Sequence, residues 1–327
     1  MNKKHSPRIL IVGAGAVGQV YGRHLQLGGA DVTFLVKPHH VANLSAPLPF
    51  YPLNQCTIED EPVGFSDYQL VTEPPTPESA PYDQVWLCVS STALRQSWLP
   101  TLCDRIGDAT VVSLLPGIED RTLLLQYVPE SRLVSGLITL ISYPAPLEGQ
   151  PADSKGMAYW FPPMSPTPLS GPSGRRDEAV RLLRAGGQPA KSHPDVAAVS
   201  GFPTAVLMPL LMGLEASDWK FSTLSSSEHG PQALDGVREA IKIVSKHHAV
   251  SEPWWIKFLG KTALQAMLWI APKVVPLPLE TYLDYHFNKV GDQTRLFIDT
   301  YIRMGQEQGL PTSSLETLRG QILAAAA

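Results

Sequence analysis

The sequence predicts an α/β fold in which a doubly wound parallel sheet is followed by a mostly α-helical domain. Strand-like and helix-like stretches alternate in the first half of the chain, a glycine-rich turn joins the first such pair, and helical patterns dominate the second half. The length of 327 residues exceeds the usual size of one domain, so we expect two. We place them at residues 1–174 and 175–327.

The first elements form a strand, a helix and a second strand. Arg8–Val12 is a short apolar run, Val17–Leu27 has helical spacing up to Gly28-Gly29, and Asp31–Val36 reads as the next strand. The same alternation continues with strands at 84–89 and 110–115 around a helix at 92–105. This order predicts parallel strands with right-handed helical crossovers.

The second half begins after a connection. Residues 143–174 are rich in proline, glycine and serine and are expected to link the domains. The helices expected beyond them are Asp177–Ala185, Asp195–Trp219, Gln232–His247, Pro253–Ile270 and Leu279–Gln308.

One segment is apolar over about the width of a membrane. Phe258–Leu277 is nevertheless interrupted by Lys261, Lys273 and Pro272, which predicts a buried helix or a homodimer interface rather than a membrane span. Trp254 and Trp255, at the expected helix start, are predicted to pack in a hydrophobic core.

Composition excludes several classes of protein. The net charge of −4 provides no basic field for nucleic acid, and no membrane partner is expected. Cys56, Cys88 and Cys103 have no paired spacing, so we expect neither disulfides nor a metal site. The N-terminus does not resemble a signal peptide, and a cytoplasmic location is expected.

The turn after the first strand carries the dinucleotide-binding pattern. In Gly13-Ala14-Gly15-Ala16-Val17-Gly18, the first glycine permits a tight turn, Gly15 lets the backbone approach a diphosphate, and Gly18 allows close packing of helix and strand. The helix N-terminus offers its free N–H groups to the phosphates. The alternative is a glycine turn that binds nothing.

The end of the second strand distinguishes the two nicotinamide cofactors. An acidic residue there bonds the ribose 2′-hydroxyl, whereas a basic residue accommodates a 2′-phosphate. The strand is followed by Lys37-Pro38-His39-His40, and Asp31 lies at its start instead. The sequence therefore favours NADP(H), with Lys37 on the phosphate; the alternative for Lys37 is a solvated loop lysine.

These motifs, with Asp83–Val89 and the C-terminal stretch 294–318, make the chain resemble the ketopantoate reductase (2-dehydropantoate 2-reductase) family. That family joins a Rossmann domain to a helical domain of the 6-phosphogluconate dehydrogenase type and uses NADPH to reduce a 2-oxo acid. The resemblance implies the same two-domain fold and an oxidoreductase acting on a small-molecule substrate.

The resemblance also implies that this chain is a divergent member, because polar residues of the family are replaced. Ser90 stands at the cofactor site where the family has lysine, and Pro116 replaces an asparagine. The family's catalytic lysine has no counterpart within Ser200–Thr204, and Arg295 occupies the place of the substrate-binding glutamate.

A polar cluster could substitute for the missing groups. His286, Lys289, Asp292 and Arg295 are three or four residues apart, so on one helix they would share a face with Tyr285 and Asn288 nearby. This face could bind an anionic substrate, and His286 or Lys289 could donate a proton. The alternative is a solvated face with Lys289–Asp292 and Asp292–Arg295 ion pairs. Tyr143 either enters the cleft between the domains or packs in the linker.

The sequence thus favours an NADP(H)-dependent oxidoreductase that transfers hydride to or from a carbonyl, hydroxyl or imine group of a small polar molecule in the cleft between its domains. Two alternatives remain open: a catalytically silent NADP(H)-binding sensor, and ketopantoate reduction through substitute residues.

Overall fold

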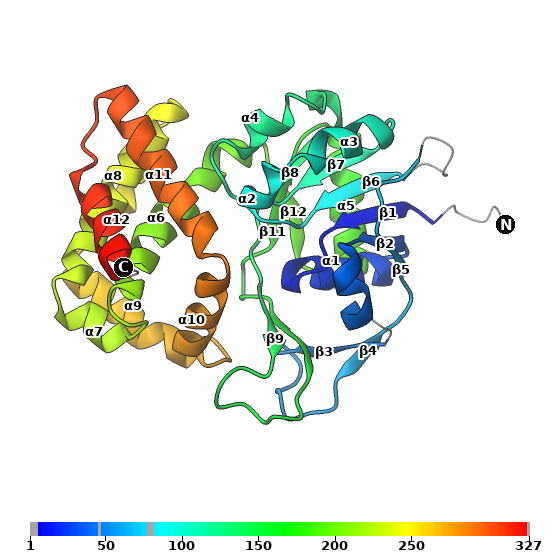
Figure 1. Ribbon diagram of the computed structural model, residues 1–327, viewed down its shortest axis with the longest axis horizontal. Helices are drawn as coiled ribbons and strands as arrows, with labels where there is room; N and C mark the ends of the chain where they lie inside the picture. The colour runs from blue at the N-terminus through cyan, green and yellow to red at the C-terminus, as the bar shows by residue number, and fades with distance from the viewer. Residues whose placement is uncertain (1–5, 45–46, 77–81, 326–327) are drawn as a thin grey trace. The chain divides into compact units, whose positions relative to one another are not determined.

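A computed structural model of the chain describes residues 6–44, 47–76 and 82–325. The chain divides into two compact units, residues 1–197 and residues 198–327, shown in Figure 1. The expected boundary at residues 174–175 lies too early in the chain. The reason is that α5 (Ser173–Ala185) and β12 (Ala190–Ser192) pack on the first unit: α5 contacts α1 (Ala16–Leu27), and β12 pairs with β11 (Thr167–Ser170).

The first unit is built on an eight-stranded sheet in the order β12-β11-β8-β7-β6-β1-β2-β5. The remaining strands are β8 (Leu133–Gly136), β7 (Thr110–Ser113), β6 (Gln84–Leu87), β1 (Arg8–Val12), β2 (Asp31–Leu35) and β5 (Gln69–Val71). All neighbours are parallel except β8 and β11. The parallel sheet predicted from the sequence is confirmed.

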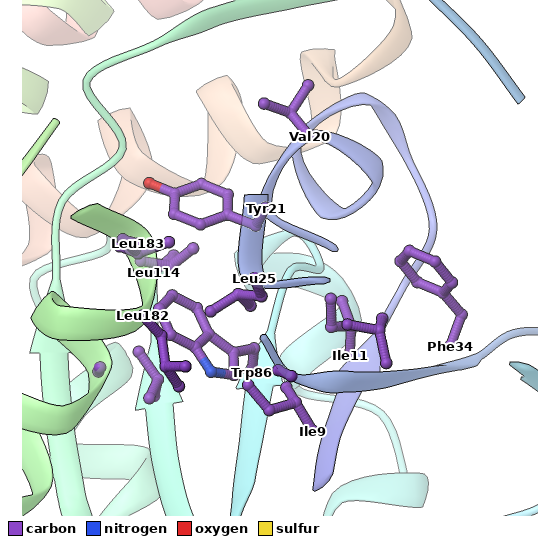
Figure 2. Packing of buried hydrophobic residues seen from close by; sticks show 14 of the residues in the cluster. Ile9, Ile11, Val20, Tyr21, Leu25, Phe34, Trp86, Leu114, Leu182 and Leu183 are labelled. Atoms are coloured by element: carbon purple, nitrogen blue, oxygen red, sulfur yellow. The ribbon is translucent and has the colours of Figure 1, made fainter. Parts of the chain in front are cut away.

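Alternate residues of β1 face two separate cores, as the period of a strand requires. Ile9 and Ile11 belong to a core with Tyr21 and Trp86, seen in Figure 2. Leu10 and Val12 belong to the core on the opposite face, with side chains of the helices α2 (Ser91–Leu94), α3 (Trp98–Arg105) and α4 (Asp120–Leu124). Burial on both faces explains why this strand has no polar residue after Arg8.

A second sheet of four strands, in the order β4-β3-β10-β9, lies outside the predicted pattern. It joins β3 (Leu48–Pro52) and β4 (Val63–Phe65) to β9 (Ile141–Ala145) and β10 (Gly156–Trp160). Residues 143–174 are therefore not a plain connection between domains. Their prolines misled the prediction because Pro144 and Pro168 occupy strands.

His24 ties the second sheet to α1. Its Nδ1 donates to the Gly186 carbonyl at 2.7 Å, and its Nε2 lies 3.2 Å from the Tyr159 hydroxyl of β10. Burial lowers the pKa of His24 to about 4, so the ring is neutral at neutral pH. Because a carbonyl only accepts, the neutral ring carries its proton on Nδ1 and accepts from Tyr159 on Nε2.

The second unit is helical. It contains α6 (Ala197–Glu215), α7 (Phe221–Ser226), α8 (His229–His247), α9 (Lys261–Val274), α10 (Leu279–Lys289), α11 (Gly291–Gln308) and α12 (Ser313–Ala325). Among the described residues, α6 is the one single helix long and apolar enough to cross a bilayer, but 56% of its apolar window is buried within the structure. That burial is typical of a core helix.

Two of the expected helices are interrupted. The range 279–308 is broken at Val290–Gly291, where α10 ends and α11 starts, because glycine is a poor residue for a helix interior. The range 253–270 divides into a short 3₁₀ turn, Trp254–Phe258, and α9, with Gly260 as the N-cap between them.

The apolar segment around α9 is not a buried helix. Leu264 is the buried residue of α9, and Trp269 is 67% exposed. Trp254 is 75% exposed, so the prediction that it packs in a core is wrong. The homodimer interface stays a prediction for this segment.

Candidate functional site

The glycine turn lies between β1 and α1, as the motif requires. Gly13 has φ +94°, and a Cβ there would come within 2.7 Å of the Cys88 carbonyl oxygen. A Cβ on Gly18 would lie 2.0 Å from the Gly13 carbonyl oxygen. These two glycines are thus required by the backbone conformation and packing of the protein itself.

Gly15 differs from both. A Cβ there meets no atom within 4 Å, and its backbone is extended, with φ −73°. Neither packing nor conformation of the protein requires glycine at this position, which leaves the close approach of a ligand as the reason for it.

The N-terminus of α1 is suited to an anion. Gly15 is the N-cap and has no side chain to bond the free N–H groups, and the first turn carries no acidic residue. The positive end of the helix dipole is therefore uncompensated by the helix's own side chains. Ala14, Ala16 and Val17 complete the turn with small or apolar, partly buried side chains that pack against the core of the first unit.

Lys37 is exposed directly after β2, where a cofactor's adenosine ribose is expected. His39 and His40 follow in an exposed 3₁₀ helix, Pro38–Leu44, with their ring centroids 4.1 Å apart. Lys37 thus places a positive charge at the end of this strand, followed by two exposed imidazoles.

Sequence reasoning missed a carboxylate at this edge of the sheet. β5 runs parallel to β2, Leu35 pairs with Val71, and the Val36 N–H donates to the Val71 carbonyl. Glu73, two residues past that strand, is exposed at the same edge as Lys37. The signal was hidden because β5 is short and its residue Gln69 lies 36 positions after its register partner Thr33, a pairing that sequence spacing does not indicate.

Ser90 lies after β6, and Cys88, the residue that follows this strand, packs against the glycine turn. Its Oγ caps α2 by accepting from the Ala93 N–H at 3.1 Å, and it lies 2.9 Å from the Thr92 hydroxyl. Ser90 therefore has a structural role in starting α2. Its contact with the cofactor stays a prediction.

A buried carboxylate connects the loops after β6 and β7. Asp120 is 1% exposed and accepts from the Gly117 N–H at 2.9 Å and from the Ser91 hydroxyl at 2.5 Å. It also pairs with Arg95 at 2.7 Å. Because β6 and β7 are parallel neighbours, this network fixes two loops at the carboxyl edge of the sheet, the edge that carries the glycine turn. The sequence offered no signal for it beyond the spacing of Gly117 and Asp120.

The predicted polar face of the second unit is not continuous. His286 and Lys289 lie on α10, whereas Asp292 and Arg295 lie on α11, beyond the break at Val290. Arg295 donates to Glu215 of α6 at 2.6 Å and to the Gly291 carbonyl at 2.9 Å. The expected ion pair of Arg295 with Asp292 is thus replaced by one with Glu215, which neutralises its charge.

His286 is half-buried and stacked on Tyr282, with ring centroids 5.4 Å apart. Burial, followed by the nearby charge of Lys289, lowers its pKa to about 4. The imidazole is therefore neutral at neutral pH and does not serve as a cationic acid there. Lys289 is exposed at the end of α10 and supplies the positive charge of this face.

The remaining candidates have structural environments. Tyr143 is 1% exposed within β9 and its hydroxyl accepts from Gln150 at 3.0 Å, so the alternative in which it packs is confirmed. Within Ser200–Thr204 on α6, the Thr204 hydroxyl donates to the Gly201 carbonyl and accepts from Tyr301 at 2.9 Å. Among the described residues, no three His, Cys, Asp or Glu side chains are grouped to hold a metal ion.

Comparison with known proteins agrees with this architecture. Residues 9–145 match the family model described as "Ketopantoate reductase PanE/ApbA". A search of curated proteins gives no match to the sequence.

Solved structures share the fold over almost the whole chain. A PanE/ApbA family ketopantoate reductase from Ralstonia eutropha JMP134 has a TM-score of 0.74 at 16% identity, covering 97% of each chain. The ternary structure of D-mandelate dehydrogenase with NADH and anilino(oxo)acetate has a TM-score of 0.72 at 16% identity, covering 97% of each chain. A 2-dehydropantoate 2-reductase from Geobacter metallireducens GS-15 has a TM-score of 0.68 at 18% identity, covering 97% of this chain and 99% of that one.

The family match covers part of the chain, whereas the shared fold covers almost all of it. The family match covers β1 through the glycine turn, the loops fixed by Asp120 and the strands up to β9. The structural likeness extends through the helical unit. Residues 9–145 are thus similar to the PanE/ApbA ketopantoate reductase family model, and the chain shares a Rossmann-like and helical fold with ketopantoate reductase structures.

Proposed function

We propose that the chain is an oxidoreductase that binds NADP(H) and transfers hydride to or from a carbonyl, hydroxyl or imine group of a small polar molecule. The observation that carries this proposal is Gly15, a glycine that the protein does not need for its own packing, at the uncapped N-terminus of α1. Neighbouring structures include reductases and a dehydrogenase solved with NADH, which supports redox chemistry.

The residues of the first unit would hold the cofactor. The N–H groups at the start of α1 bind the diphosphate, and Lys37 pairs with the 2′-phosphate of NADP(H). When bound, the nicotinamide ring supplies or accepts the hydride. Glu73 disfavours NADP(H) relative to NAD(H), because a carboxylate at that edge repels a 2′-phosphate and can accept a hydrogen bond from a ribose hydroxyl.

A titration of both cofactors tests the preference. Lys37→Ala should weaken NADPH binding by about tenfold, the loss of one charge-assisted contact, and leave NADH binding unchanged. Glu73→Gln should strengthen NADPH binding instead. Lys242→Ala, an exposed lysine of α8, is the matched control. Equal affinity of the wild type for NADH and NADPH would contradict the assignment to NADP(H).

For the substrate we propose a small anionic molecule of the 2-oxo or 2-hydroxy acid class. Dehydropantoate and mandelate, in the names of the neighbouring proteins, belong to this class. Lys289 would bind the substrate carboxylate, since Arg295 is already paired with Glu215. The neutral His286 beside it can donate an N–H bond to a carbonyl oxygen that gains negative charge.

Steady-state kinetics on a panel of 2-oxo acids, ketones and imines tests the substrate class. Lys289→Ala should raise KM for acidic substrates by about tenfold, without changing the affinity for NADPH. The Lys242→Ala variant should have unchanged kinetics. A KM that does not move in Lys289→Ala would remove Lys289 from the substrate site, and turnover of ketopantoate itself would identify reduction through substitute residues.

A second candidate function is a cofactor-binding sensor without catalysis. It is favoured by the ion-paired Arg295 and by the segment Ser200–Thr204, which contains no lysine and whose Thr204 bonds Tyr301. In that case NADPH would raise the melting temperature while no compound of the panel is reduced.

A further inference from the structure

The segment from the 3₁₀ turn Trp254–Phe258 through α9 exposes an unusual amount of apolar surface. Among the described residues, seven of the sixteen exposed large apolar side chains fall between positions 254 and 274. They are Trp254, Trp255, Phe258, Met267, Trp269, Ile270 and Val274. Scattered exposed apolar residues are ordinary, but a contiguous set marks an interaction surface.

The helix itself shows how the surface is arranged. Leu264, Leu268 and Ala271 are four and three residues apart and are the less exposed positions, so they form the face that packs on the unit. Ala263, Met267, Ile270 and Val274 repeat at the same spacing and form an exposed apolar stripe. Figure 1 shows α9 near α7 and α10, and α9 packs on α7, α8 and α10.

Charge distinguishes between candidate partners. The stretch 253–279 contains Lys257, Lys261 and Lys273, all exposed, and no aspartate or glutamate. A two-fold contact between copies of this chain would set the same cationic patch against itself. A partner with negative charge is therefore favoured over a second copy, even though the chain as a whole has a net charge of −4.

The residue types favour a bilayer over an acidic protein. Three of the seven tryptophans of the chain are here, and tryptophan with lysine is the combination typical of side chains at the interface of a membrane. The Lys273 ammonium lies 2.8 Å from the centroid of the Trp269 ring, so an apolar and a cationic group occupy the same point of the surface.

An open groove adjoins this surface. It has a volume of about 460 Å³ and is lined by Phe221, Leu268, Trp269, Pro272 and Leu277. The carboxylate at its rim, Glu280, is engaged by the Phe221 N–H at 2.5 Å. The groove is thus an apolar recess beside the lysines, which fits the acyl part of a lipid whose headgroup is anionic.

We propose that the surface formed by Trp254–Phe258 and α9 docks the protein on a bilayer containing anionic phospholipid, with the tryptophans at the interface and the three lysines on the headgroups. This departs from the expectation, drawn from composition, that the chain has no membrane partner. The expectation was based on the net charge of the whole chain, whereas docking on a bilayer depends on the local charge of one surface.

Co-sedimentation of the full chain with vesicles tests the proposal. We expect binding to vesicles with about 30 mol% phosphatidylglycerol and at least about tenfold weaker binding to pure phosphatidylcholine. Trp254→Ser with Ile270→Ser should weaken binding about tenfold or more. Replacing Lys257, Lys261 and Lys273 by glutamine should weaken it about fivefold for each lysine.

Matched controls keep the test decisive. Met164→Asn removes an apolar side chain that is even more exposed, at 99%, and far from this segment in sequence, and it should leave vesicle binding unchanged. The lysine variants keep the apolar side chains, so they remain informative if the serine variants fold poorly. Failure of the wild type to bind anionic vesicles, or equal binding by all variants, would overturn the proposal. A dimer that the serine substitutions dissociate, without vesicle binding, would assign this surface to a second copy instead.

Discussion

At the scale of single residues, the three glycines of the turn have different physical roles. Gly13 and Gly18 are required by backbone conformation and packing, whereas Gly15 faces open space. The roles expected from the motif, a tight turn at Gly13, ligand approach at Gly15 and close packing at Gly18, agree with these surroundings. Measurements of stability and of cofactor affinity can separate them.

We expect Gly18→Ala to lower the free energy of unfolding by about 1–3 kcal/mol, because its Cβ would overlap the Gly13 carbonyl. Gly15→Ala should leave stability unchanged within about 0.5 kcal/mol and weaken NADPH binding by about tenfold or more. Urea denaturation and fluorescence titration measure the two quantities. If Gly15→Ala bound NADPH like the wild type, the diphosphate would have to bind elsewhere.

His24 gives a residue-scale prediction about pH. Burial lowers the pKa of the folded ring to about 4 from the usual 6.5, so the unfolded chain binds more protons between these values. The free energy of unfolding should therefore fall as the pH decreases from about 6.5 to about 4. Above pH 6.5 the ring is neutral in both states, so His24 causes no loss of stability there. Urea midpoints at several pH values measure it.

His24→Asn is the informative variant for this pH dependence. The asparagine amide can still donate to the Gly186 carbonyl but does not titrate. The variant should show a shallower loss of stability in acid, whereas the exposed His247→Asn should behave like the wild type. An unchanged slope in His24→Asn would mean that other groups govern the acid sensitivity.

At the scale of elements, the sequence predicted the helices and strands whose residue pattern lies within one short stretch of the chain. The β1–α1–β2 unit follows from an apolar run, a glycine turn and a helical period within 30 residues. The second sheet and β5 could not be predicted in this way, because β3 pairs with β10 through residues such as Phe50 and Met157, which are distant in the chain.

In the candidate site, too, residues close together in sequence could be predicted and those brought together by strand pairing could not. The glycine turn and Lys37 could be recognised from neighbouring residues, whereas Glu73 and Asp120 reach the site through strand pairing. The predicted face of His286, Lys289 and Arg295 failed as one face, because Gly291 starts a new helix between Lys289 and Arg295. The partner of Arg295, Glu215, belongs to another helix and no spacing rule connects them.

The buried network of Asp120 makes a prediction at this scale. Asp120→Ala leaves the Gly117 N–H without its acceptor and Arg95 without its ion-pair partner, although Arg95 still donates to the Ser91 carbonyl. It should lower the free energy of unfolding by about 3 kcal/mol, the lower end of the range for breaking a buried ion pair, because Arg95 is partly exposed. Asp108→Ala removes the bidentate partner of Arg175 at a site 86% exposed and should cost less than about 1 kcal/mol. Equal losses in the two variants would show that Asp120 is not a structural anchor.

At the scale of the whole molecule, two units with separate cores should respond separately to the cofactor. The glycine turn and Lys37 belong to residues 1–197, so NADPH should stabilise that unit. At one hundred times its Kd, a ligand adds about 2.7 kcal/mol, which is about 5–10 °C in melting temperature for a unit of this size.

Differential scanning calorimetry should therefore resolve two transitions, of which NADPH raises one. Gly18→Ala should lower the melting temperature of that same transition. Tyr301→Phe, which removes the hydroxyl bound to Thr204, should lower the melting temperature of the transition of the second unit. If NADPH shifted a single common transition, the two units would unfold cooperatively and the separation drawn from their internal contacts would not hold in solution.

The four-stranded sheet has a consequence for how the chain is made. Its first two strands, β3 and β4, leave the ribosome well before residues 156–160, which supply the neighbour of β3. During that interval one side of β3 has no strand beside it, and an open strand edge is a site for pairing with other chains. Slowing translation before residues 156–160 have left the ribosome should thus increase aggregation of this protein, whereas slowing it after they have left should not.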